Sequence, residues 1–563
     1  MTLIIAGERS GVGKTTVTLA LLSALCRGSQ FRLGEAPPTV QSFKVGPDYI
    51  DPMFHHHVTG RPCRNLDPVL TSEDYVRSCF QYHSQNAAHV LVEGVMGLFD
   101  GVETPPSRYG TDSAWSAHQR RLKIPDYGST AHIARLLNIP VVLVLDCSHL
   151  SGSIAAIVQG YRTFDPQIYL AGVVLNRVGS DRHLRLLSQA LTGIQVPILG
   201  VLRRQTEITI PDRHLGLVPA GELSNLDQVL DRLTTLGETC FDWEKLRPLL
   251  TPQRLLSCPL PPSQAVLPPS PEAQPAIAVA QDQAFNFYYA DNLDLLQRAG
   301  ARLLSWSPLA GEPLPPGTQG LYLGGGFPEL FAAQLAAQSK LLKSLKDLIE
   351  QGLPTYAECG GLIYLCRQLV DFEGRSHRMV GVIPGEVTME RRLTLGYRRA
   401  IALGQSSILG EGETVWGHEF HRSQLSWRLA AAPECLEPQA LGSGPTADRM
   451  SDRMSDRMSD RMTDRMTDRI TNPTPAANLA ASPPVTSAPD DRDLFQIQTL
   501  ADLAQPDHAI VPSYPEGWRL PHLHASYVHL HWGARPELAD RLVALCRQFP
   551  PLGSKGGSPI KSP

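Results

Sequence analysis

The sequence predicts an α/β protein of two domains, each a mostly parallel sheet flanked by helices, with a disordered insertion in the second. Three observations predict this fold class. Short apolar runs that end at a polar residue, each followed by an amphipathic helical stretch, recur along both halves of the chain. A proline-rich stretch separates the two halves. The length of 563 residues, with 42% hydrophobic and 19% charged side chains, is too great for one ordinary domain.

The first predicted domain, residues 1–245, carries the apolar runs TLIIAG, HVLVEG, PVVLVLD and AGVVLNR. Such runs suit strands that are buried on both faces of a parallel sheet, where ligands bind at the carboxyl ends of the strands. Glu93, Asp146 and Asn176 stand at such ends. We therefore expect these three side chains at the ligand-binding edge of the sheet.

A linker is predicted at 246–275, because its many prolines fix φ and lack backbone donors. The second domain is predicted to span 276–550. Within it, a tetrapeptide repeat of the type DRMS and a Pro/Ala/Ser/Thr tract offer almost no apolar surface. We therefore predict a disordered insertion at about 437–492, with a transient helix as the alternative, and a disordered tail at 551–563.

Composition argues against several classes of partner. The net charge is only -4, with 51 basic and 55 acidic residues, so no global field favours a nucleic acid or an anionic membrane. The N-terminus lacks a charged leader and a cleavage site, and no run of 18 apolar residues occurs. The 10 cysteines contain no C-x-x-C pair, which favours reduced thiols. We expect a soluble, cytoplasmic protein with a small-molecule substrate.

The stretch GERSGVGKTT, from Gly7 to Thr16, lies between an apolar strand and a helical run, as a phosphate-binding loop requires. Its backbone N–H groups can surround phosphate oxygens, while Lys14 reaches the β- and γ-phosphates and Thr15 holds Mg²⁺. The spacing departs from the usual motif, because Glu8 occupies the place of the first glycine. The residues predicted to bind nucleotide in this loop are Gly11, Gly13, Lys14, Thr15 and Thr16.

Carboxylates beside Thr15 would complete a magnesium site, since Mg²⁺ prefers hard oxygen ligands. Glu93 ends its strand in a suitable place, and Asp48 in FKVGPDYIDP is the second candidate. Ordinary turn chemistry is an equally good reading of Asp48 and Asp51, because both lie next to proline. The histidines at 55–57 form a weak metal motif, because successive side chains point in different directions.

The stretch AECGG around Cys359 has the pattern of a nucleophile elbow, in which small residues permit a sharp turn from strand to helix. A buried core thiol is the alternative. Glycines 324–326 offer further N–H groups for an oxyanion. A nucleophilic thiol needs a base, and the sequence alone does not choose among its candidates, which are His522, His524, His529 and His531.

These motifs together resemble the cobyrinic acid a,c-diamide synthases, glutamine-dependent amidoligases of corrinoid biosynthesis. The resemblance covers both domains in order and rests on SGVGKTTVT, FKVGPDYIDP, VEGVMGLFDG, GSTAHIARLL, RHLGLVPAGE, FNFYYADNLDLL, GLYLGGGFPEL, AECGGLIYL, GHEFHRS and ASYVHLHW. It implies a first domain similar to dethiobiotin synthetase and a second domain similar to class I glutamine amidotransferases.

The resemblance implies that Cys359 is the glutaminase nucleophile and that His529, in SYVH, raises its reactivity. Most class I amidotransferases have a glutamate two residues beyond this histidine, where this chain has His531. A Cys–His dyad is therefore expected.

In the first domain, the resemblance assigns Asp48 and Glu93 to Mg²⁺ binding or phosphoryl transfer. It assigns Asp100, in GLFDG, to substrate handling. Asn176 is similar to residues that recognise the nucleotide base.

The implied reaction is amidation of the a and c acetate groups of cobyrinic acid through an acyl phosphate, with Mg²⁺ as cofactor and ATP and L-glutamine as co-substrates. Hydrogenobyrinic acid and nickel-sirohydrochlorin are alternative substrates. A P-loop switch ATPase with an inactive amidotransferase-like domain, or a corrinoid carrier, are alternatives of other classes. The sequence is compatible with a homodimer.

Overall fold

The computed structural model describes residues 2–28, 38–103, 124–204, 225–250, 274–427, 492–499 and 513–553, with short pieces at 212–213, 216–217 and 222. All of these described residues belong to one compact unit. The predicted insertion apart from Arg492, most of the predicted linker and most of the predicted tail lie outside the described residues.

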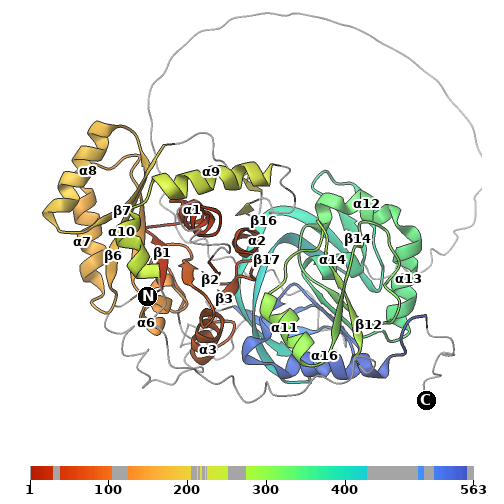
Figure 1. Ribbon diagram of the computed structural model, residues 1–563. Helices are drawn as coiled ribbons and strands as arrows, with labels where there is room; N and C mark the ends of the chain where they lie inside the picture. The colour runs from red at the N-terminus through yellow and green to blue at the C-terminus, as the bar shows by residue number, and fades with distance from the viewer. Residues whose placement is uncertain are drawn as a thin grey trace, which may run out of the picture. The chain divides into compact units, whose positions relative to one another are not determined.

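The first half of the chain forms a seven-stranded sheet in which all neighbouring strands are parallel (Figure 1). In spatial order the strands are β3 (Arg64–Leu66), β2 (Val40–Val45), β4 (His89–Glu93), β1 (Leu3–Gly7), β5 (Val141–Asp146), β6 (Leu170–Val178) and β7 (Ile198–Arg203). A separate two-stranded pair is formed by β8 (Asp212–Arg213) and β9 (Gly216–Leu217). The predicted parallel sheet is thereby confirmed.

Helices cover both faces of this sheet, as its continuous apolar strands predict. Along β1, Leu3 and Ile5 join one core, whereas Ile4 and Ala6 join the other. The first core is covered by α1 (Lys14–Arg27), α2 (Ile50–Thr59), α9 (Leu226–Thr239) and α10 (Trp243–Leu250). The second core is covered by α3 (Glu73–Ser84), α6 (Thr130–Leu137), α7 (Ile154–Phe164) and α8 (Asp181–Gly193).

The second half contains a six-stranded sheet that is parallel except at one edge strand. Its strands in spatial order are β11 (Arg302–Trp306), β10 (Ala276–Ala280), β12 (Thr318–Leu323), β13 (Thr355–Glu358), β21 (Leu523–Ser526) and β20 (Trp518–Leu520). Its helices are α11 (Ala290–Arg298), α12 (Ala332–Ala337), α13 (Ser339–Glu350), α14 (Gly360–Leu365) and α16 (Glu537–Gln548), with short 3-10 turns η5 (Pro328–Phe331) and η6 (Trp532–Ala534).

A further sheet in the second half, largely antiparallel, was not predicted from the sequence. Its long strands alternate buried and more exposed residues, the pattern of a sheet that packs on a core with one face. Its strands are β14 (Cys366–Val370), β15 (Ser376–Arg378), β16 (Ile383–Ala402), β17 (Thr414–Ser426), β18 (Phe495–Thr499), β19 (Tyr514–Glu516) and β22 (His529–Leu530).

Helix α10 extends to Leu250, into the stretch predicted to be linker. Pro248 lies inside this helix and removes one backbone hydrogen bond. The burial of Trp243, Leu246 and Leu250 offsets that loss. At the other end of the predicted linker, β10 begins at Ala276, where the sequence predicts the second domain to start.

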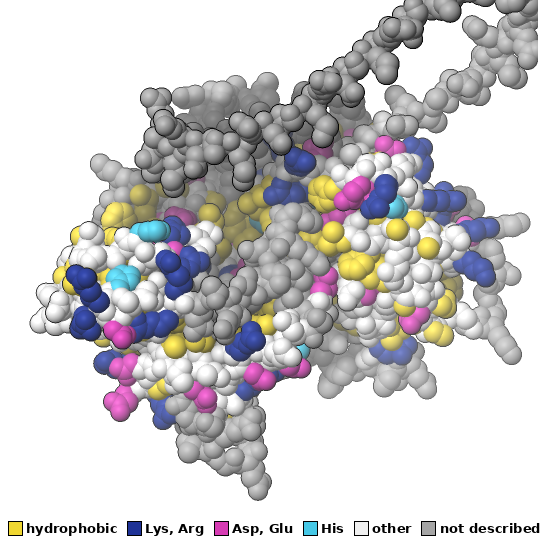
Figure 2. All heavy atoms as spheres, turned by 90° about the horizontal axis from the view of Figure 1, so that it is seen from above, with side chains coloured by type: hydrophobic (Ala, Val, Ile, Leu, Met, Phe, Trp, Pro, Cys, Tyr) yellow, Lys and Arg dark blue, Asp and Glu magenta, His cyan; other side chains and the backbone are white. Residues whose placement is uncertain are grey.

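Among the described helices, none is long and apolar enough to cross a membrane. Figure 2 shows one face of the molecule, over which Lys and Arg side chains and Asp and Glu side chains are both scattered. This mixture agrees with the small net charge of -4.

Candidate active sites

The phosphate-binding loop joins β1 to α1, as predicted. Gly13 immediately precedes the helix and has φ 96°, a conformation that favours glycine, and a Cβ there would collide with the amide of Asn176. Because Gly13 has no side chain, it cannot cap the first N–H groups of α1. Asn176 instead fixes the loop from outside, since its Nδ2 donates to Val12 O at 2.8 Å. The helix N-terminus therefore presents its N–H groups to an anion.

Lys14 lies at the first position of α1 with its ammonium held over the loop. Its Nζ donates to Met96 O at 2.5 Å and to Arg9 O at 3.3 Å. Burial, and then the positive charge of Lys44, lower the pKa of Lys14 to about 8. At neutral pH this amine is thus mostly protonated, and it loses its charge as the pH rises past about 8.

We expect the affinity for ATP to fall as the pH rises from about 7 to about 9.5, by up to tenfold per unit above the Lys14 pKa of about 8. Deprotonation removes the positive charge that faces the phosphates. Calorimetric Kd values across this range test it, with Lys14→Arg as the comparison, because a guanidinium stays charged throughout. A wild-type Kd that is flat across the range contradicts the prediction.

Two buried carboxylates flank the hydroxyl of Thr15. Its Oγ1 donates to Glu93 Oε1 at 2.8 Å and lies 3.4 Å from Asp51 Oδ2. Lys44 Nζ contacts Asp51 and lies 2.9 Å from Glu93 Oε1. Burial, reinforced by Asp48 and Glu93, raises the pKa of Asp51. Burial also acts to raise the pKa of Glu93, but Lys44 and His55 together exceed this effect and lower it. Oxygen donors therefore converge beside the loop.

Asp48 makes the turn contacts that the sequence offered as one interpretation, and its second oxygen faces the acidic cluster. Its Oδ1 accepts from the N–H of Ile50 at 2.8 Å and of Asp51 at 3.2 Å, which is turn chemistry at the start of α2. Its Oδ2 lies 3.5 Å from Lys44 Nζ, toward the acidic cluster. The structure also brings Asp51 to within 3.4 Å of Thr15, a contact that the sequence did not indicate.

His55 is a site residue that sequence reasoning missed. Its Nε2 lies 2.7 Å from Glu93 Oε2, and its Nδ1 lies 3.4 Å from Cys63 Sγ. Despite complete burial, contacts with Cys63 and then Glu93 raise the pKa of His55 to about 10. His56 and His57 are exposed, as expected for successive residues. The useful signal was the spacing of Asp51 and His55, which places both on one face of a helix.

The predicted synthetase residues surround a cavity of about 990 Å³, a size suited to a nucleotide or drug-sized ligand. Those that line it are Gly11, Gly13, Lys14, Thr15, Thr16, Asp48, Asp100 and Asn176. Asp100 is held by the N–H of Gly97, which donates to its Oδ2 at 2.8 Å. Glu93 is fully buried behind Thr15. Residues of β16 and β17, among them Tyr397 and Phe420, line the same cavity.

Glu8, which replaces the usual first glycine of the loop, makes its own contacts away from the phosphate-binding N–H groups. Its Oε1 accepts from Asp146 N at 3.3 Å. Arg9 lies 3.9 Å from Glu8 and 3.1 Å from Asp146, so its guanidinium offsets both carboxylates. Asp146 also pairs with Arg177. The unfavourable negative charge beside the phosphates is thereby compensated.

Cys359 occupies the turn between β13 and α14, with φ 45° and ψ -99°. A positive φ in a residue other than glycine is strained, and it is typical of a nucleophile held at a sharp elbow. The side chain is 5% exposed, and its Sγ lies 3.9 Å from Phe420 O. Burial, and then the charge of Glu329, raise the pKa of this thiol. Attack by Cys359 therefore requires a base that removes its proton.

The glycine turn at 324–326 lies against both parts of the thiol site. A Cβ built on Gly360 would come within 3.1 Å of Gly326 N, and one built on Gly325 would come within 2.6 Å of His529 Cε1. The turn thus packs against His529 and against the residue that follows Cys359. The other candidate bases are engaged elsewhere: His522 with Ile349 O, His524 with Ser406 and His531 with Asp291.

Glu358, directly before the nucleophile, is the carboxylate that lies beside His529. Its Oε2 is 3.6 Å from His529 Nδ1, and its Oε1 accepts from Leu530 N at 2.9 Å and from Tyr356 Oη. His529 Nδ1 has no hydrogen-bond partner within the described part of the chain. No spacing in the sequence indicates this pair, because the two residues lie on different strands far apart in the chain.

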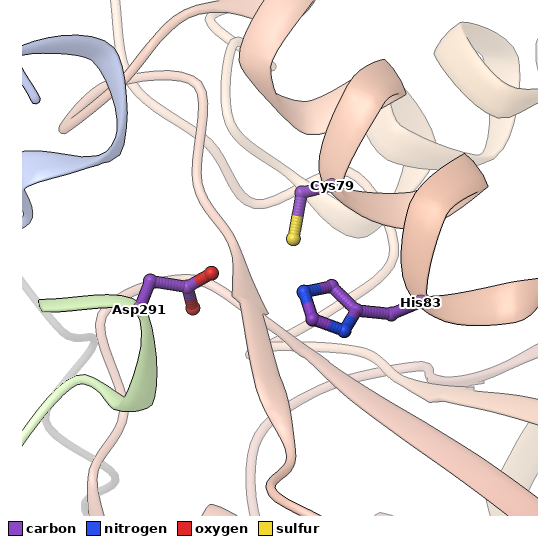
Figure 3. A group of neighbouring side chains, drawn as sticks. All are labelled: Cys79, His83 and Asp291. Carbon is purple, nitrogen blue, oxygen red and sulfur yellow. The ribbon is translucent and has the colours of Figure 1, made fainter. Parts of the chain in front are cut away.

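Cys79, His83 and Asp291 bring one sulfur, one nitrogen and one oxygen within 4.8 Å of one another (Figure 3). Cys79 and His83 belong to α3, and Asp291 belongs to α11. Arg64 lies 3.5 Å from Asp291, and after burial it is the main cause that lowers the pKa of His83, to about 4. Arg64 therefore supplies at this place the positive charge that a metal ion would bring.

The fold and the two sites define a class of protein, in which a P-loop nucleotide-binding domain is joined to a glutamine amidotransferase domain. Residues 3–218 match the CobQ/CobB/MinD/ParA nucleotide binding domain, and residues 276–451 match the CobB/CobQ-like glutamine amidotransferase domain. The chain belongs to the cobyrinate a,c-diamide synthase family.

Relatives in this family match most of the chain. A cobyrinate a,c-diamide synthase of Synechococcus sp. is 48% identical over 97% of this chain and 99% of its own length. One of Synechocystis sp. is 56% identical over 76% of this chain and 83% of its own length. A hydrogenobyrinate a,c-diamide synthase of Streptomyces coelicolor is 40% identical over 77% of this chain and 88% of its own length.

Proposed function

We propose that this chain is a glutamine-hydrolysing carbon–nitrogen ligase that amidates the a and c acetate carboxylates of cobyrinic acid in cobalamin biosynthesis. The observation that carries the proposal is the presence, in one compact unit of a chain of this family, of a phosphate-binding cavity and a separate Cys359 elbow. The substrates are then small molecules, ATP, L-glutamine and a corrinoid, and the cytoplasm is the expected location. A homodimer stays a prediction.

The first step activates the carboxylate. Transfer of the γ-phosphoryl group of ATP to a corrinoid acetate gives an acyl phosphate and ADP, so a poor electrophile becomes a good one. In this proposal Lys14 and the N–H groups at Gly11, Gly13 and Thr16 hold the phosphates. Asp100, which lines the same cavity, is the residue proposed to handle the acceptor. Asn176, which already fixes the loop through Val12, is the proposed base-recognition residue.

A magnesium ion fits the donor set beside the loop, because hydroxyl and carboxylate oxygens are its preferred ligands. Thr15, Asp48 and Glu93 are the proposed ligands, with Asp51 as an additional oxygen donor 3.4 Å from Thr15. When bound, Mg²⁺ would supply neutralisation of phosphate charge. Lys44 and His55 fix Glu93 from the protein side and balance part of its charge.

The second site releases ammonia from glutamine. Cys359 Sγ attacks the side-chain amide carbon while its proton passes to His529, which returns a proton to the departing ammonia. In this proposal the N–H groups of Gly326 and Gly360, which lie close to each other beside Cys359, stabilise the oxyanion. Water then hydrolyses the thioester to glutamate. Ammonia attacks the acyl phosphate, and the products are the amide and inorganic phosphate.

We expect Glu358→Gln to lower glutamine-dependent amidation by about 10- to 100-fold, because the carboxylate beside His529 would no longer orient and stabilise the imidazolium. The separation of 3.6 Å needs to shorten by a fraction of an ångström in the complex. Ammonia-dependent amidation should stay within about twofold, because it bypasses this site.

The split between kcat and KM for glutamine separates an orienting role from a structural one. In Glu358→Gln the loss should fall on kcat while KM changes little, because the carboxylate acts on His529 and not on glutamine. The exposed Glu373→Gln is the matched control and should leave both rates unchanged. A loss confined to KM, or an equal loss with ammonia, contradicts the orienting role.

The test of the proposed function is the mass of the product formed from cobyrinic acid, Mg·ATP and glutamine labelled with ¹⁵N in its amide. Two labelled amides per corrinoid are expected. Parallel reactions with hydrogenobyrinic acid and nickel-sirohydrochlorin test the alternative acceptors, of which the first is favoured by the name of the Streptomyces coelicolor relative. If neither ATP nor glutamine is consumed with any acceptor, the proposed function is wrong.

A further inference from the structure

Tyr49 lies between the acidic turn of the phosphate site and the base of the thiol site. It sits between Asp48 and Ile50, yet its ring packs on the second half of the chain. It stacks on Phe287 with ring centroids 5.3 Å apart, and its centroid lies 4.5 Å from that of Tyr289 and 5.1 Å from that of His529. Tyr49 also lines the cavity of about 990 Å³. One side chain therefore touches both sites.

Other rings of the cavity wall also lie beside the thiol site. Phe287, His418 and Phe420 line the same cavity. Behind them, Phe420 O accepts from Cys359 Sγ at 3.9 Å, and His418 is the strand partner of His529. Burial, and then the proximity of His529, lower the pKa of His418 to about 3, so its imidazole is neutral at ordinary pH.

A boundary of this composition suits neutral ammonia. Aromatic rings at the boundary exclude water, which limits protonation and loss of ammonia at this point. His418 Nδ1 is buried and has no hydrogen-bond partner among the described residues, so it can bind a small polar molecule that passes.

The backbone of Tyr49 is tied to the state of the acidic turn. Asp48 Oδ1 holds the N–H groups of Ile50 and Asp51, and these bonds fix the start of α2 on which Tyr49 stands. A nucleotide or cation that engages the other oxygen, Oδ2, which faces the acidic cluster, acts on the same carboxylate. Occupation of the phosphate site thus acts on the position of the Tyr49 ring.

We propose that Tyr49 is a positioning residue that closes the boundary between the glutaminase centre and the ATP cavity and couples glutamine hydrolysis to occupation of that cavity. This inference rests on the proposed function. With the ring in place, glutamine hydrolysis is slow until ligands fill the cavity, and the ammonia then passes to the acceptor. Without the ring, glutamine is hydrolysed even when the cavity is empty, and the ammonia escapes.

The test compares the full-length wild type with Tyr49→Ala, Tyr49→Phe and the control Tyr75→Phe, which removes a hydroxyl that donates to Asp291 at 2.8 Å. Glutamine hydrolysed per amide formed should be about one in the wild type and about fivefold higher or more in Tyr49→Ala. Tyr49→Phe and Tyr75→Phe should remain near the wild-type ratio. Ammonia-dependent amidation by Tyr49→Ala should stay within about threefold of wild type.

A second measurement does not depend on the acceptor. Alkylation of Cys359 by iodoacetamide, followed by peptide mass, should be at least about threefold faster in Tyr49→Ala, because the cavity then opens onto the thiol. An unchanged ratio together with unchanged alkylation overturns the proposal. Equal losses with glutamine and ammonia also overturn it, by giving Tyr49 a purely structural role. Failure of the wild type to form any amide instead rejects the proposed function, and the alkylation rates still decide the role of Tyr49.

Discussion

Cys359→Ser is expected to lower glutamine-dependent amidation by about 10³-fold or more while ammonia-dependent amidation continues near the wild-type rate. A serine hydroxyl has a far higher pKa than a thiol, and the same burial that raises the pKa of Cys359 also opposes formation of an alkoxide. The acyl phosphate forms elsewhere, in the cavity lined by Lys14 and Thr15, so external ammonia can still capture it. The measurement is amide formation with each nitrogen source under saturating Mg·ATP.

The matched control is Cys366→Ser, which makes the same chemical change at the other end of α14, in a residue that is fully buried. It should retain both activities apart from a loss of stability. Two outcomes contradict the division of labour between the sites. One is a Cys359→Ser protein that still hydrolyses glutamine, and the other is one that is folded but inactive with ammonia as well.

Lys14→Ala is expected to lower amidation by about 10³-fold with glutamine and with ammonia alike. Lys14 is the ammonium held over the phosphate-binding loop by Met96 O and Arg9 O. Without it, the negative charge that develops on the transferring phosphoryl group loses its main protein cation. ADP release with each nitrogen source measures the loss directly.

The exposed Lys343→Ala, on α13, is the control for removal of one positive charge, and its rates should equal those of the wild type. Basal glutamine hydrolysis by Lys14→Ala should persist, because Cys359 and His529 are untouched. If Lys14→Ala forms ADP at the normal rate, phosphoryl transfer does not occur at this loop.

The sequence was sufficient for those parts of the sites that are local in the chain. The order of strand, glycine turn and helix predicted the phosphate-binding loop. The rule that ligands bind at the carboxyl ends of parallel strands predicted the place of Glu93. The small residues around Cys359 predicted its elbow, which its positive φ confirms. In each case a backbone constraint within a few residues determines the geometry.

Contacts between distant segments escaped prediction. His55 reaches Glu93, Glu358 reaches His529, and Tyr49 reaches His529 only because separate strands and helices meet. The antiparallel sheet built on β16 and β17 also depends on pairing between distant segments. Its alternation of buried and exposed residues was interpreted as part of the alternating strand and helix pattern. Local periodicity carries no information on which segments become neighbours.

The backbone strain at Cys359 links the chemistry of this protein to its folding margin. A residue held at φ 45° and ψ -99° costs on the order of 1–3 kcal/mol, a sizeable share of the ~5–15 kcal/mol that usually separates folded from unfolded protein. The packing of β13 and α14 supplies that free energy. Substitutions that loosen this core, although far from the thiol, would let the turn relax first. When substitutions or heat loosen this core, glutaminase activity would be lost while the domain is still folded.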